Sequence, residues 1–554
     1  MKETLLIIFF AFIGITTNVV YAQTSGICGD DLTWQLTGSG NELTLTINGS
    51  GEMYDYTRYY DSRPWDSYKN NIKTIIINRG VSVIGECAFY QSFNLEYVTI
   101  PNTVTKLGNN SFFACNSLAT LTIPNSVTVI GSSVFEACSS LTSITVDTDN
   151  LNYSSNNGVL YNKLQDTLIY CPAGKEGIFT VPNSVTDIAE KAFQNCRKLT
   201  SITVPNSVLT IGSSAFSICT SLVSINIDAN NLNYSSSDGI FYNKLQDTLL
   251  CCPSGKTGVI IIPNTVITIS DDAFNFCREL TSIIIPNSVI TIGKGVFEHC
   301  YGLTSVEIGN SVESIGDFAF CWSGLTSITI PNSVKSIGRY IFSDCSNLES
   351  AIIGNSVMAM KEGAFSSCSR LTSVEIGNSV VEIGYTAFYE CYRLNTLIMG
   401  ESVATIGDGA FAYCVSLNSI TCKTITPPEI YYNTFYYVPI NAQVFIPCNT
   451  SLSYQNSDWG SIFTNFIEDC NTGLNENVLN RGIIIYPNPA NDKIFVGCED
   501  FSSIKIYDIS GKEVLIQNAN GRTEFNISNL PKGVYIVNIL LADKIIGNGK
   551  IVKK

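Results

Sequence analysis

Cysteine is the residue type with the greatest chemical potential in this 554-residue sequence, which contains 20 cysteines. In a chain bound for an oxidising compartment, such a content ordinarily predicts a framework of disulfides. Ten of these cysteines, however, recur at one position of a sequence repeat, and Cys321 lies one residue from its expected place. The repeated position is occupied by Cys115, Cys138, Cys196, Cys219, Cys277, Cys300, Cys345, Cys368, Cys391 and Cys414.

Stacked repeats would place these sulfur atoms in a column, with neighbours about 4.8 Å apart. We expect the column to be buried, because an unpaired cysteine behaves as a small hydrophobic side chain. Occasional disulfides between repeats are the alternative, since the Cα spacing is near the allowed window. A zinc site is not expected, because no C-x-x-C pair occurs. Cys448 and Cys470, outside the repeats, are the best disulfide candidates.

The only histidine is His299, and equivalent positions hold residues as different as Ala137, Asn195 and Asp344. This variety predicts an exposed position that is free to vary. One histidine in such a setting does not favour a Ser-His-Asp or Cys-His arrangement, and the sequence contains neither a nucleophile-elbow motif nor a phosphate-binding glycine loop. We therefore expect no catalytic residues, no cofactor and no bound metal.

The composition excludes several classes of partner. Hydrophobic residues make up 45% of the chain and charged residues 14%, which predicts a folded protein. The formal net charge is −15 and no basic cluster offsets it, so neither nucleic acid nor an anionic membrane surface is expected as a partner.

The first residues are typical of a cleavable signal peptide. Lys2 precedes an apolar run from Leu5 to Ile15, and Val20-Tyr21-Ala22 places small residues at the positions that signal peptidase prefers. A transmembrane anchor is the alternative, but the run is short for spanning about 30 Å of hydrocarbon. We expect residues 1–22 to be removed, leaving no membrane-spanning segment.

The chemistry-bearing residues are positioned by an internal repeat in which an Ile-Gly pair recurs, mostly every 23 residues. Two longer steps contain a similar insertion. A fixed period of this size predicts a solenoid, in which each coil buries its apolar side chains only against its neighbours. The anchors of the repeat are Ile84, Leu107, Ile130, Ile188, Ile211, Ile269, Ile292, Ile315, Ile337, Met360, Ile383 and Ile406.

One coil, from Ile130 to Val146, illustrates the expected structure. Gly131 is expected to relieve the backbone at a corner. Phe135 and Cys138 fill the interior, and Leu141, Ile144 and Val146 point inward from a short strand.

The repeat boundaries predict six segments: a signal peptide (1–22), an N-terminal β cap (23–78), a solenoid (79–424), a C-terminal cap (425–469), a linker (470–482) and a final β domain (483–554). The two insertions, at about 147–181 and 228–262, each contain two apolar runs around a polar centre. This pattern predicts β-hairpins that project from the edge of the solenoid.

Two exposed surfaces are candidates for binding. Outward positions of the strands form a flat, polar, almost uncharged face on the order of 55 Å long. The plainer interpretation of this face is a sheet that only contacts water. The residues of the face are Ser143, Ser201, Ser224, Ser282, Ser305, Ser327 and Ser373, with Glu307 and Glu375. Tyrosines concentrate near the end of the array and either cap its core or form a contact patch; they are Tyr385, Tyr389, Tyr392, Tyr413, Tyr431, Tyr432, Tyr436 and Tyr437.

The repeat IPNSV-x-x-IG-x-x-AF-x-x-C-x-x-LTSI resembles the BspA-like leucine-rich repeats of bacterial surface proteins, over about residues 28–468. The opening Cys28-Gly29-Asp30, with Trp34 and Arg63-Pro64-Trp65, resembles the N-terminal cap often seen with them. The resemblance implies a mainly β, right-handed leucine-rich-repeat solenoid of short strands and short helical turns. It also implies adhesion to host matrix proteins or to other bacteria.

The C-terminal segment resembles the type A sorting domain of the type IX secretion system of Bacteroidetes, and its alternating strands predict a small immunoglobulin-like β-sandwich. The resemblance implies export across the outer membrane by that machinery and display on, or release from, the cell surface. The resemblance to the sorting domain is carried by Pro487, Asn488 and Pro489 after Tyr486, by Gly511, by Gly533 and Tyr535, and by the terminal Lys553 and Lys554.

Three functions compete at this stage. The leading hypothesis is a non-enzymatic surface protein or adhesin that binds a protein or glycan ligand on host or neighbouring cells. The first alternative is a glycan-acting enzyme that uses carboxylates alone, for which Glu307, Glu349 and Glu375 are the strand acids in question. The second is a structural surface protein without a ligand.

Overall fold

The computed structural model describes residues 24–58, 63–470, 484–486, 490–497, 501–508, 512–519, 523–541 and 544–553. The chain divides into two compact units, with the boundary between Ile467 and Glu468. The expected signal peptide and almost all of the expected linker lie outside the described residues.

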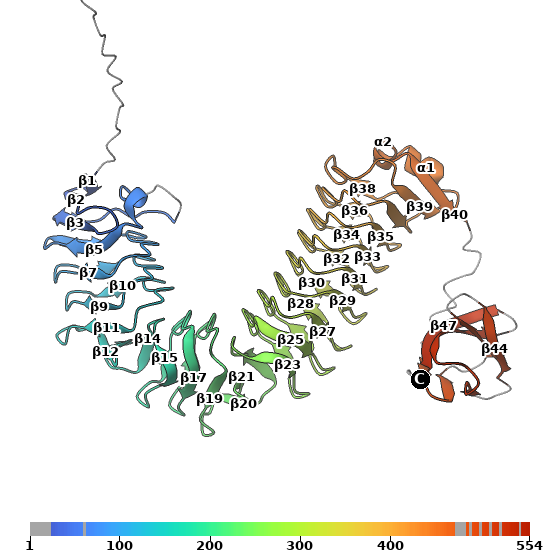
Figure 1. Cartoon of the computed structure of the whole chain (residues 1–554), viewed down its shortest axis with the longest axis horizontal. Coiled ribbons are helices and arrows are strands. Elements are labelled where there is room, and N and C mark those ends of the chain that lie inside the picture. Colours follow the sequence, from blue (N-terminus) through green and yellow to red (C-terminus); the bar gives the residue numbers. More distant parts are fainter. Residues whose placement is uncertain are drawn as a thin grey trace, which may run out of the picture. The chain divides into compact units, whose positions relative to one another are not determined.

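Each coil of the first unit contributes a short strand at the Ile-Gly anchor, two residues long except in β6, and within each sheet these strands pair in parallel with those of the neighbouring coils (Figure 1). The pairing keeps the anchor side chains in register, as between Ile383 and Ile406. The anchor strands are β6 (Val81–Ile84), β8 (Lys106–Leu107), β10 (Val129–Ile130), β16 (Asp187–Ile188), β18 (Thr210–Ile211), β24 (Thr268–Ile269), β26 (Thr291–Ile292), β28 (Ser314–Ile315), β30 (Ser336–Ile337), β32 (Ala359–Met360), β34 (Glu382–Ile383), β36 (Thr405–Ile406) and β38 (Glu429–Ile430).

A second, longer strand in each coil carries the alternation of buried and exposed side chains that the sequence predicts. In β29, for example, Ile328 and Ile330 are buried while Ser327 and Thr329 are exposed. These strands are β5 (Ile72–Ile77), β7 (Tyr97–Thr99), β9 (Thr120–Ile123), β11 (Ser143–Val146), β15 (Glu176–Thr180), β17 (Lys198–Val204), β19 (Ser224–Ile227), β23 (Thr257–Ile261), β25 (Glu279–Ile284), β27 (Ser305–Glu307), β29 (Ser327–Ile330), β31 (Ser350–Ile353), β33 (Ser373–Glu375), β35 (Thr396–Met399), β37 (Ser419–Cys422), β39 (Gln443–Pro447) and β40 (Asn465–Asp469).

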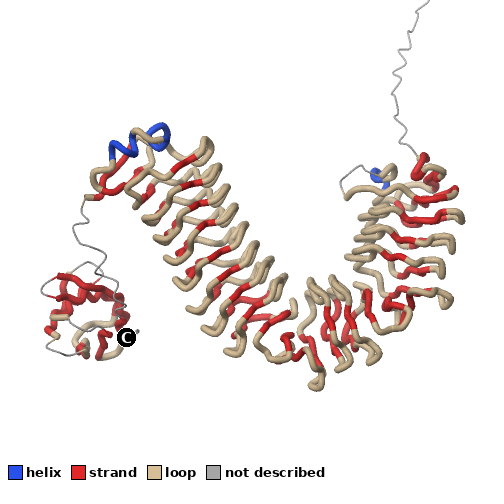
Figure 2. The backbone as a smooth tube through the Cα atoms, turned by 180° about the vertical axis from the view of Figure 1, so that it is seen from behind, coloured by secondary structure: helices blue, strands red, loops and turns tan. Residues whose placement is uncertain are grey.

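The corner between the two strands is a run of hydrogen-bonded turns, and Figure 2 shows helix only near the two ends of the described repeat unit. The residue before the repeated cysteine has a positive φ in successive coils, including Ala137 (62°), Ile218 (60°) and Tyr413 (64°). This left-handed conformation is unfavourable for bulky side chains. It is stabilised here because the N–H groups of the corner donate to the next coil, as from Tyr413 to the carbonyl of Tyr436 (2.8 Å).

The glycine of the anchor pair serves a different purpose from the one that the sequence predicts. Gly131 has no positive φ, but a Cβ atom there would lie 2.7 Å from the backbone nitrogen of Asn109 in the preceding coil. Glycine is therefore required because two backbones approach closely, and not because a corner is strained.

The interior of the coils is a stack of phenylalanine rings beside the cysteine column. The ring centroids of Phe342, Phe365, Phe388 and Phe411 follow one another at 4.9, 5.2 and 5.1 Å. All ten cysteines of the repeated position are buried and free, so the expected buried column is confirmed.

The two insertions interrupt the stack. The first contains β12 (Tyr153–Asn156), β13 (Val159–Asn162) and β14 (Thr167–Tyr170), and the second contains β20 (Tyr234–Ser237), β21 (Ile240–Asn243) and β22 (Thr248–Cys251). The expected projecting hairpin is wrong in one respect. Its last strand, β14, pairs in parallel with anchor strand β16 and so continues the anchor sheet instead of leaving it. The core correspondingly forms three clusters, which change at the two insertions.

The ends of the array are closed by aromatic side chains. The N-terminal strands are β1 (Ser25–Gly29), β2 (Leu32–Thr37), β3 (Leu43–Gly49) and β4 (Gly51–Glu52), followed by the 3-10 helix η1 (Asp66–Tyr68). There the rings of Trp34 and Trp65 meet edge to face at 5.9 Å. At the other end α1 (Ser451–Gln455) and α2 (Asp458–Ile462) place Trp459 on the last phenylalanine of the stack, Phe435 (5.1 Å). The coil geometry continues through β38 and β39, past the expected boundary at residue 424.

The second unit consists of two antiparallel sheets that share one hydrophobic core. Ile494 and Phe525 of one sheet and Ile504 and Val537 of the other are buried in it. The strands are β41 (Ile484–Tyr486), β42 (Lys493–Gly497) and β45 (Glu524–Asn526) in one sheet, and β43 (Ser503–Asp508), β44 (Glu513–Asn518), β46 (Gly533–Leu541) and β47 (Lys544–Lys553) in the other.

Candidate functional site

The outward serines of the longer strands lie in register within each sheet. Ser201 pairs with Ser224, Ser282 with Ser305, and Ser327 with Ser350. Ser305 and Ser327 are exposed, whereas Ser143, Ser201, Ser224, Ser282 and Ser373 are half-buried. Ser201 and Ser224 are also joined through Asn226, whose amide donates to Ser201 Oγ (2.9 Å) and whose carbonyl oxygen accepts from Ser224 Oγ (2.6 Å).

The outward positions expected to form one polar face do not lie on one hydrogen-bonded sheet, because these strands belong to several separate sheets. The sheet of β9 and β11 ends where the first insertion begins, and that of β15, β17 and β19 ends at the second. At each break an insertion hairpin occupies the strand edge: Ile144 donates to the carbonyl of Gly158 and Ile225 to that of Gly239, both at 2.9 Å. A further break follows β27, in the one coil that is 22 residues long.

The strand carboxylates do not converge. Glu307 ends β27 and Glu375 ends β33, with β29 and β31 between them in chain order. The residue beside Glu375 in β31 is Ile352, and the residue beside Glu307 in β25 is Ile284. Glu349 lies before the start of β31 and is exposed. These acids therefore offer no pair of carboxylates that face one another across a cleft, which glycoside hydrolysis requires.

The tyrosines near the end of the array lie at the surface, and we call them the tyrosine patch (Tyr385, Tyr389, Tyr392, Tyr413, Tyr431, Tyr432, Tyr436 and Tyr437). Tyr389 and Tyr413 are half-buried, and the other six are exposed. Tyr413 and Tyr437 occupy the left-handed corner position of successive coils, which directs them to the same surface. The ring of Tyr413 lies 5.5 Å from Tyr389, 5.7 Å from Tyr436 and 5.0 Å from Tyr437.

The tyrosine patch faces solvent and does not close the core, a task performed by Phe435 and Trp459. Tyr432 is 93% exposed and Tyr437 60% exposed. Desolvation among the rings, together with the charge of Glu390, raises the pKa of Tyr389 and of Tyr392, so both hydroxyls keep their protons at neutral pH. The patch thus presents broad apolar rings with hydroxyl groups that donate hydrogen bonds.

His299 is half-buried, contrary to the expectation of an exposed position. Its ring lies 4.5 Å from Phe276 and 6.2 Å from Trp322, the residues at the same corner position in the adjacent coils. Burial and the charge of Arg278 lower its pKa, which favours the neutral imidazole. The side chain is a member of a surface row of aromatic rings.

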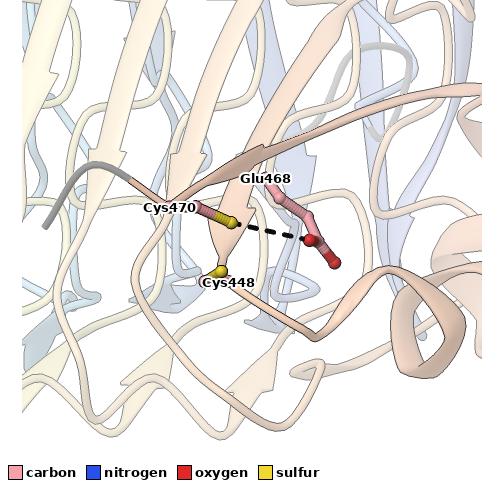
Figure 3. A group of neighbouring side chains, drawn as sticks. All are labelled: Cys448, Glu468 and Cys470. Carbon is pink, nitrogen blue, oxygen red and sulfur yellow. Dashed lines mark hydrogen bonds between the residues drawn. The ribbon is translucent and has the colours of Figure 1, made fainter.

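The cysteine column is chemically quiet. Burial raises the pKa of Cys219 and of Cys345 to about 12, so their thiolates are not formed near neutral pH. Cys448 and Cys470 are both disulfide-bonded, as the sequence favours, and Figure 3 shows their sulfur atoms next to each other. A carboxylate oxygen of Glu468 lies 3.7 Å from Cys470 Sγ (Figure 3). Because both sulfurs are oxidised, this group does not offer thiolate ligands to a metal.

The structure also contains two clefts that the sequence did not predict, one at each insertion. Residues of the first cleft have counterparts 81 positions later in the second, so that Ile130 corresponds to Ile211 and Tyr170 to Cys251. The cavity volumes are about 290 Å³ in the first cleft and about 540 Å³ in the second. The one signal in the sequence is that Tyr170 is replaced by Cys251 between two otherwise similar insertions.

The expected sorting residues are only partly within the described chain. Pro487, Asn488, Pro489, Gly511 and Lys554 lie outside the described residues. Among the others, Gly533 begins β46, Tyr535 donates from its hydroxyl to the carbonyl of Pro531 (2.8 Å), and the buried Lys553 ammonium lies 3.2 Å from Asp492. These contacts give Tyr535 and Lys553 structural roles in the second unit.

A family model described as the BspA type leucine rich repeat region matches residues 67–171, 170–255, 251–369 and 313–442, which together span more than half of the chain. The chain belongs to this family. In this BspA-type repeat protein, residues 484–554 also match the model of the secretion system C-terminal sorting domain.

The sorting domain indicates that this BspA-type protein is exported by type IX secretion, to the cell surface or the extracellular space. Among the described residues, the structure contains no helix with the length and apolar character needed to cross a membrane.

Several solved structures are similar to this BspA-type protein. A leucine-rich repeat protein from Eubacterium ventriosum is 24% identical, with a TM-score of 0.43, over 75% of this chain and 94% of its own. A leucine rich cell surface protein from Faecalibacterium prausnitzii is 26% identical, with a TM-score of 0.41, over 63% of this chain and 93% of its own. The pneumococcal vaccine antigen PcpA is 16% identical, with a TM-score of 0.40, over 80% and 98%. None of the curated proteins matches the sequence.

Proposed function

We propose that this protein is a non-enzymatic binding protein of the bacterial surface, an adhesin that holds a protein or glycan ligand through the tyrosine patch. The repeats provide the rigid support and the sorting domain provides the route to the exterior. No turnover of the ligand is involved.

The observation that carries the proposal is the exposure of the tyrosine patch. Large aromatic rings rarely gather on a surface unless they contact a partner, because their exposure to water is unfavourable. Tyrosine is also enriched at the centres of protein interfaces, since it combines apolar area with a polar hydroxyl and has few rotatable bonds. Flat aromatic faces with nearby hydroxyl donors suit a sugar ring equally well.

The outward serines of the longer strands, which we call the serine face (Ser143, Ser201, Ser224, Ser282, Ser305, Ser327 and Ser373), support the proposal less strongly. The separate sheets and half-buried serines of this face give no continuous polar platform. Ser305, Ser327, Glu307 and Glu375 remain accessible as a secondary contact region. The carboxylate-only enzyme is not favoured, because the strand acids lie apart.

The test is a binding screen of the exported protein against extracellular matrix proteins, bacterial cells and an array of glycans. The patch variant Tyr432→Ala/Tyr437→Ala is compared with Tyr97→Ala, which removes a tyrosine that is 67% exposed in β7, far along the chain from the patch. We expect the patch variant to lose binding by about 30-fold or more, the effect of removing an interface hot spot.

Tyr97→Ala should bind like the wild type, and both proteins should keep the same melting temperature. Equal loss in the two variants, or none in either, contradicts a role of the patch. Release of product from any glycan on the array would contradict the non-enzymatic assignment, and the absence of any bound partner would favour a structural surface protein.

A further inference from the structure

The two insertion clefts are built from equivalent residues, but only in the first does a side chain of the insertion donate to the carbonyl at the corner. In the first cleft the Tyr170 ring lies 5.9 Å from Phe135, and its hydroxyl donates to the Phe135 carbonyl at 2.6 Å. The protein therefore places a phenol of its own in this cleft. The floor and the hydrogen-bond acceptor are both provided by one corner of the preceding coil.

The same acceptor recurs throughout the phenylalanine stack and normally receives a side-chain donor from the next coil. The thiol of Cys138 donates to the carbonyl of Phe112 (3.1 Å), and that of Cys219 donates to the carbonyl of Phe193 (3.0 Å). At Phe135 the donor is Tyr170, because the insertion displaces the cysteine. A phenol hydroxyl thus replaces a thiol at this step of the stack.

In the second cleft the acceptor lacks this partner. The residue equivalent to Phe135, 81 positions later, is Phe216, and among the described side chains none donates to its carbonyl; the nearby thiol of Cys219 donates to Phe193 instead. Cys251 stands where the first insertion has Tyr170, and its thiol is directed to the carbonyl of Cys252 instead (3.6 Å). The cavity is about 540 Å³, compared with about 290 Å³, although Phe241 replaces the smaller Leu160 in its wall.

The remaining walls suit an aromatic ring with a cationic group attached to it. The ring of Phe241 lies 5.9 Å from Phe216 and 5.2 Å from Tyr234, which gives an apolar wall. Asp271 and Asp272 line this cleft with two carboxylates and have Lys294 nearby, whereas Glu190 and Lys191 occupy these two positions in the first cleft. A cationic group beside the ring would be attracted to this opening and a carboxylate repelled.

We propose that the second cleft is a binding site for a phenol group attached to a cation, with the phenol hydroxyl donating to the Phe216 carbonyl and the cation beside Asp271 and Asp272. Cys251 contributes by being small. The site is separate from the tyrosine patch, and the proposal does not depend on the function of that patch. Both a free phenolic amine and a tyrosine beside a lysine in a peptide present this chemistry.

The experiment is a calorimetric titration of the full exported protein with tyramine and with the peptide Lys-Tyr-Lys. Phenethylamine, which lacks the hydroxyl, and 4-hydroxyphenylacetate, which carries a negative charge, are the matched probes. We expect tyramine to bind at one site with a Kd below about 1 mM, within the affinity that ligands of its size reach. Loss of the hydroxyl should weaken binding about tenfold, and the anion should bind more weakly still. Binding of tyramine without the peptide would assign the site to small molecules, and binding of both would allow a tyrosine of a partner protein.

The chain supplies the matched variants. Cys251→Tyr introduces the phenol that the first cleft already holds and should abolish binding without lowering the melting temperature. Cys251→Tyr/Phe241→Leu reproduces the first cleft more completely and serves if the single variant unfolds. Tyr170→Cys/Lys191→Asp gives the first cleft both the small residue and the second carboxylate of the other cleft, and should create a second site and change the stoichiometry from one to two. The proposal would be overturned if Cys251→Tyr or Cys251→Tyr/Phe241→Leu bound tyramine as well as the wild type does. It would also be overturned by equal affinity for phenethylamine, or by the absence of any heat of binding up to about 10 mM tyramine.

Discussion

The thiol of Cys391 donates a hydrogen bond to the backbone carbonyl of Phe365, which lies 26 residues earlier in the preceding coil, with 3.1 Å between sulfur and oxygen. The contact recurs at Cys368 with Phe342 and at Cys414 with Phe388. Cysteine suits the position because it is small and apolar and still offers a weak donor to a buried carbonyl. This pairing explains why the column is cysteine and not alanine or valine.

The first prediction concerns this donor. Cys391→Val should lower the free energy of unfolding by about 1–3 kcal/mol, because it leaves the Phe365 carbonyl buried without its donor. The volume of valine is tolerated at this corner, since Val438 is buried three residues after Phe435 in the last coil. Cys391→Ser keeps a donor and should cost less than Cys391→Val in urea unfolding. The reverse order would mean that packing decides the choice of cysteine.

The second prediction is a loss of stability in alkali. The pKa values of Cys219 and Cys345 are raised to about 12 from 9.0 by burial. Between these values the unfolded thiol loses its proton while the folded thiol keeps it, so stability is complete below pH 9 and falls as the pH rises. Each thiol should contribute about 1.4 kcal/mol per pH unit.

Urea unfolding of the wild type and of Cys219→Ala, without reductant and under argon from pH 8.5 to 10.5, measures this contribution. The variant should be less stable at every pH. Its free energy of unfolding should fall less steeply with pH than that of the wild type, by about 1.4 kcal/mol per pH unit, because it lacks one buried thiol. Parallel pH profiles for the two proteins would show that the Cys219 thiol titrates alike in the folded and unfolded states.

Much of the array follows directly from the sequence, because period and residue type act locally. The recurrence of Ile383 and Ile406 at a fixed spacing is enough to predict stacked coils, and the buried Phe388 and Cys391 follow from their fixed distance to the anchor. The sequence favoured Cys448 and Cys470 as disulfide candidates, but it could not decide their state, since Cys28 and Cys171 also lie outside the repeated position and are free.

The features that the sequence does not disclose depend on contacts between elements. The serine face is broken because hairpin residues such as Gly158 accept hydrogen bonds from the edge of β11, a contact that no local pattern encodes. The clefts arise where an insertion strand joins the anchor sheet beside the corner of another coil. His299 is half-buried because Phe276 and Trp322 occupy the same corner of adjacent coils, and its own coil gives no indication of this.

The third prediction concerns the asparagine that attaches each insertion. The Asn150 amide donates to the carbonyls of Pro124 and Val127 (2.9 and 3.0 Å), and its oxygen accepts from the N–H groups of Asn152 and Tyr153. Asn150 is fully buried, so Asn150→Ala should reduce the free energy of unfolding by about 3 kcal/mol. Asn152→Ala, an exposed control two residues later, should change it by less than about 0.5 kcal/mol.

Asn231 makes the same contacts in the second insertion, with the carbonyls of Pro205 and Val208 (3.1 and 2.9 Å). Asn231→Ala should therefore match Asn150→Ala in thermal unfolding. A small effect at both asparagines would show that the hairpins hold their position through strand pairing alone.

The fourth prediction concerns a buried ion pair in the N-terminal cap. The Arg63 guanidinium donates from Nε to Asp66 (2.8 Å), makes a second contact with the same carboxylate oxygen, and donates to the carbonyl of Cys87 (2.9 Å). The two side chains are 1% and 4% exposed. Lys69 is the next cation, with its ammonium 3.9 Å from Asp66.

Removing one member of this pair should harm the cap more than removing both. Arg63→Met leaves the Asp66 carboxylate buried with only the Lys69 ammonium as a nearby cation and the N–H of residue 63 (3.2 Å) as a donor, and we expect a loss of about 3–5 kcal/mol in urea unfolding. Arg63→Met/Asp66→Leu removes both charges and should recover most of that loss, because an apolar pair of similar volume avoids the desolvation of two ions. Should the double variant be as unstable as the single one, the bond from Arg63 to the Cys87 carbonyl, and not the charge of Asp66, would be what joins the cap to the first coil.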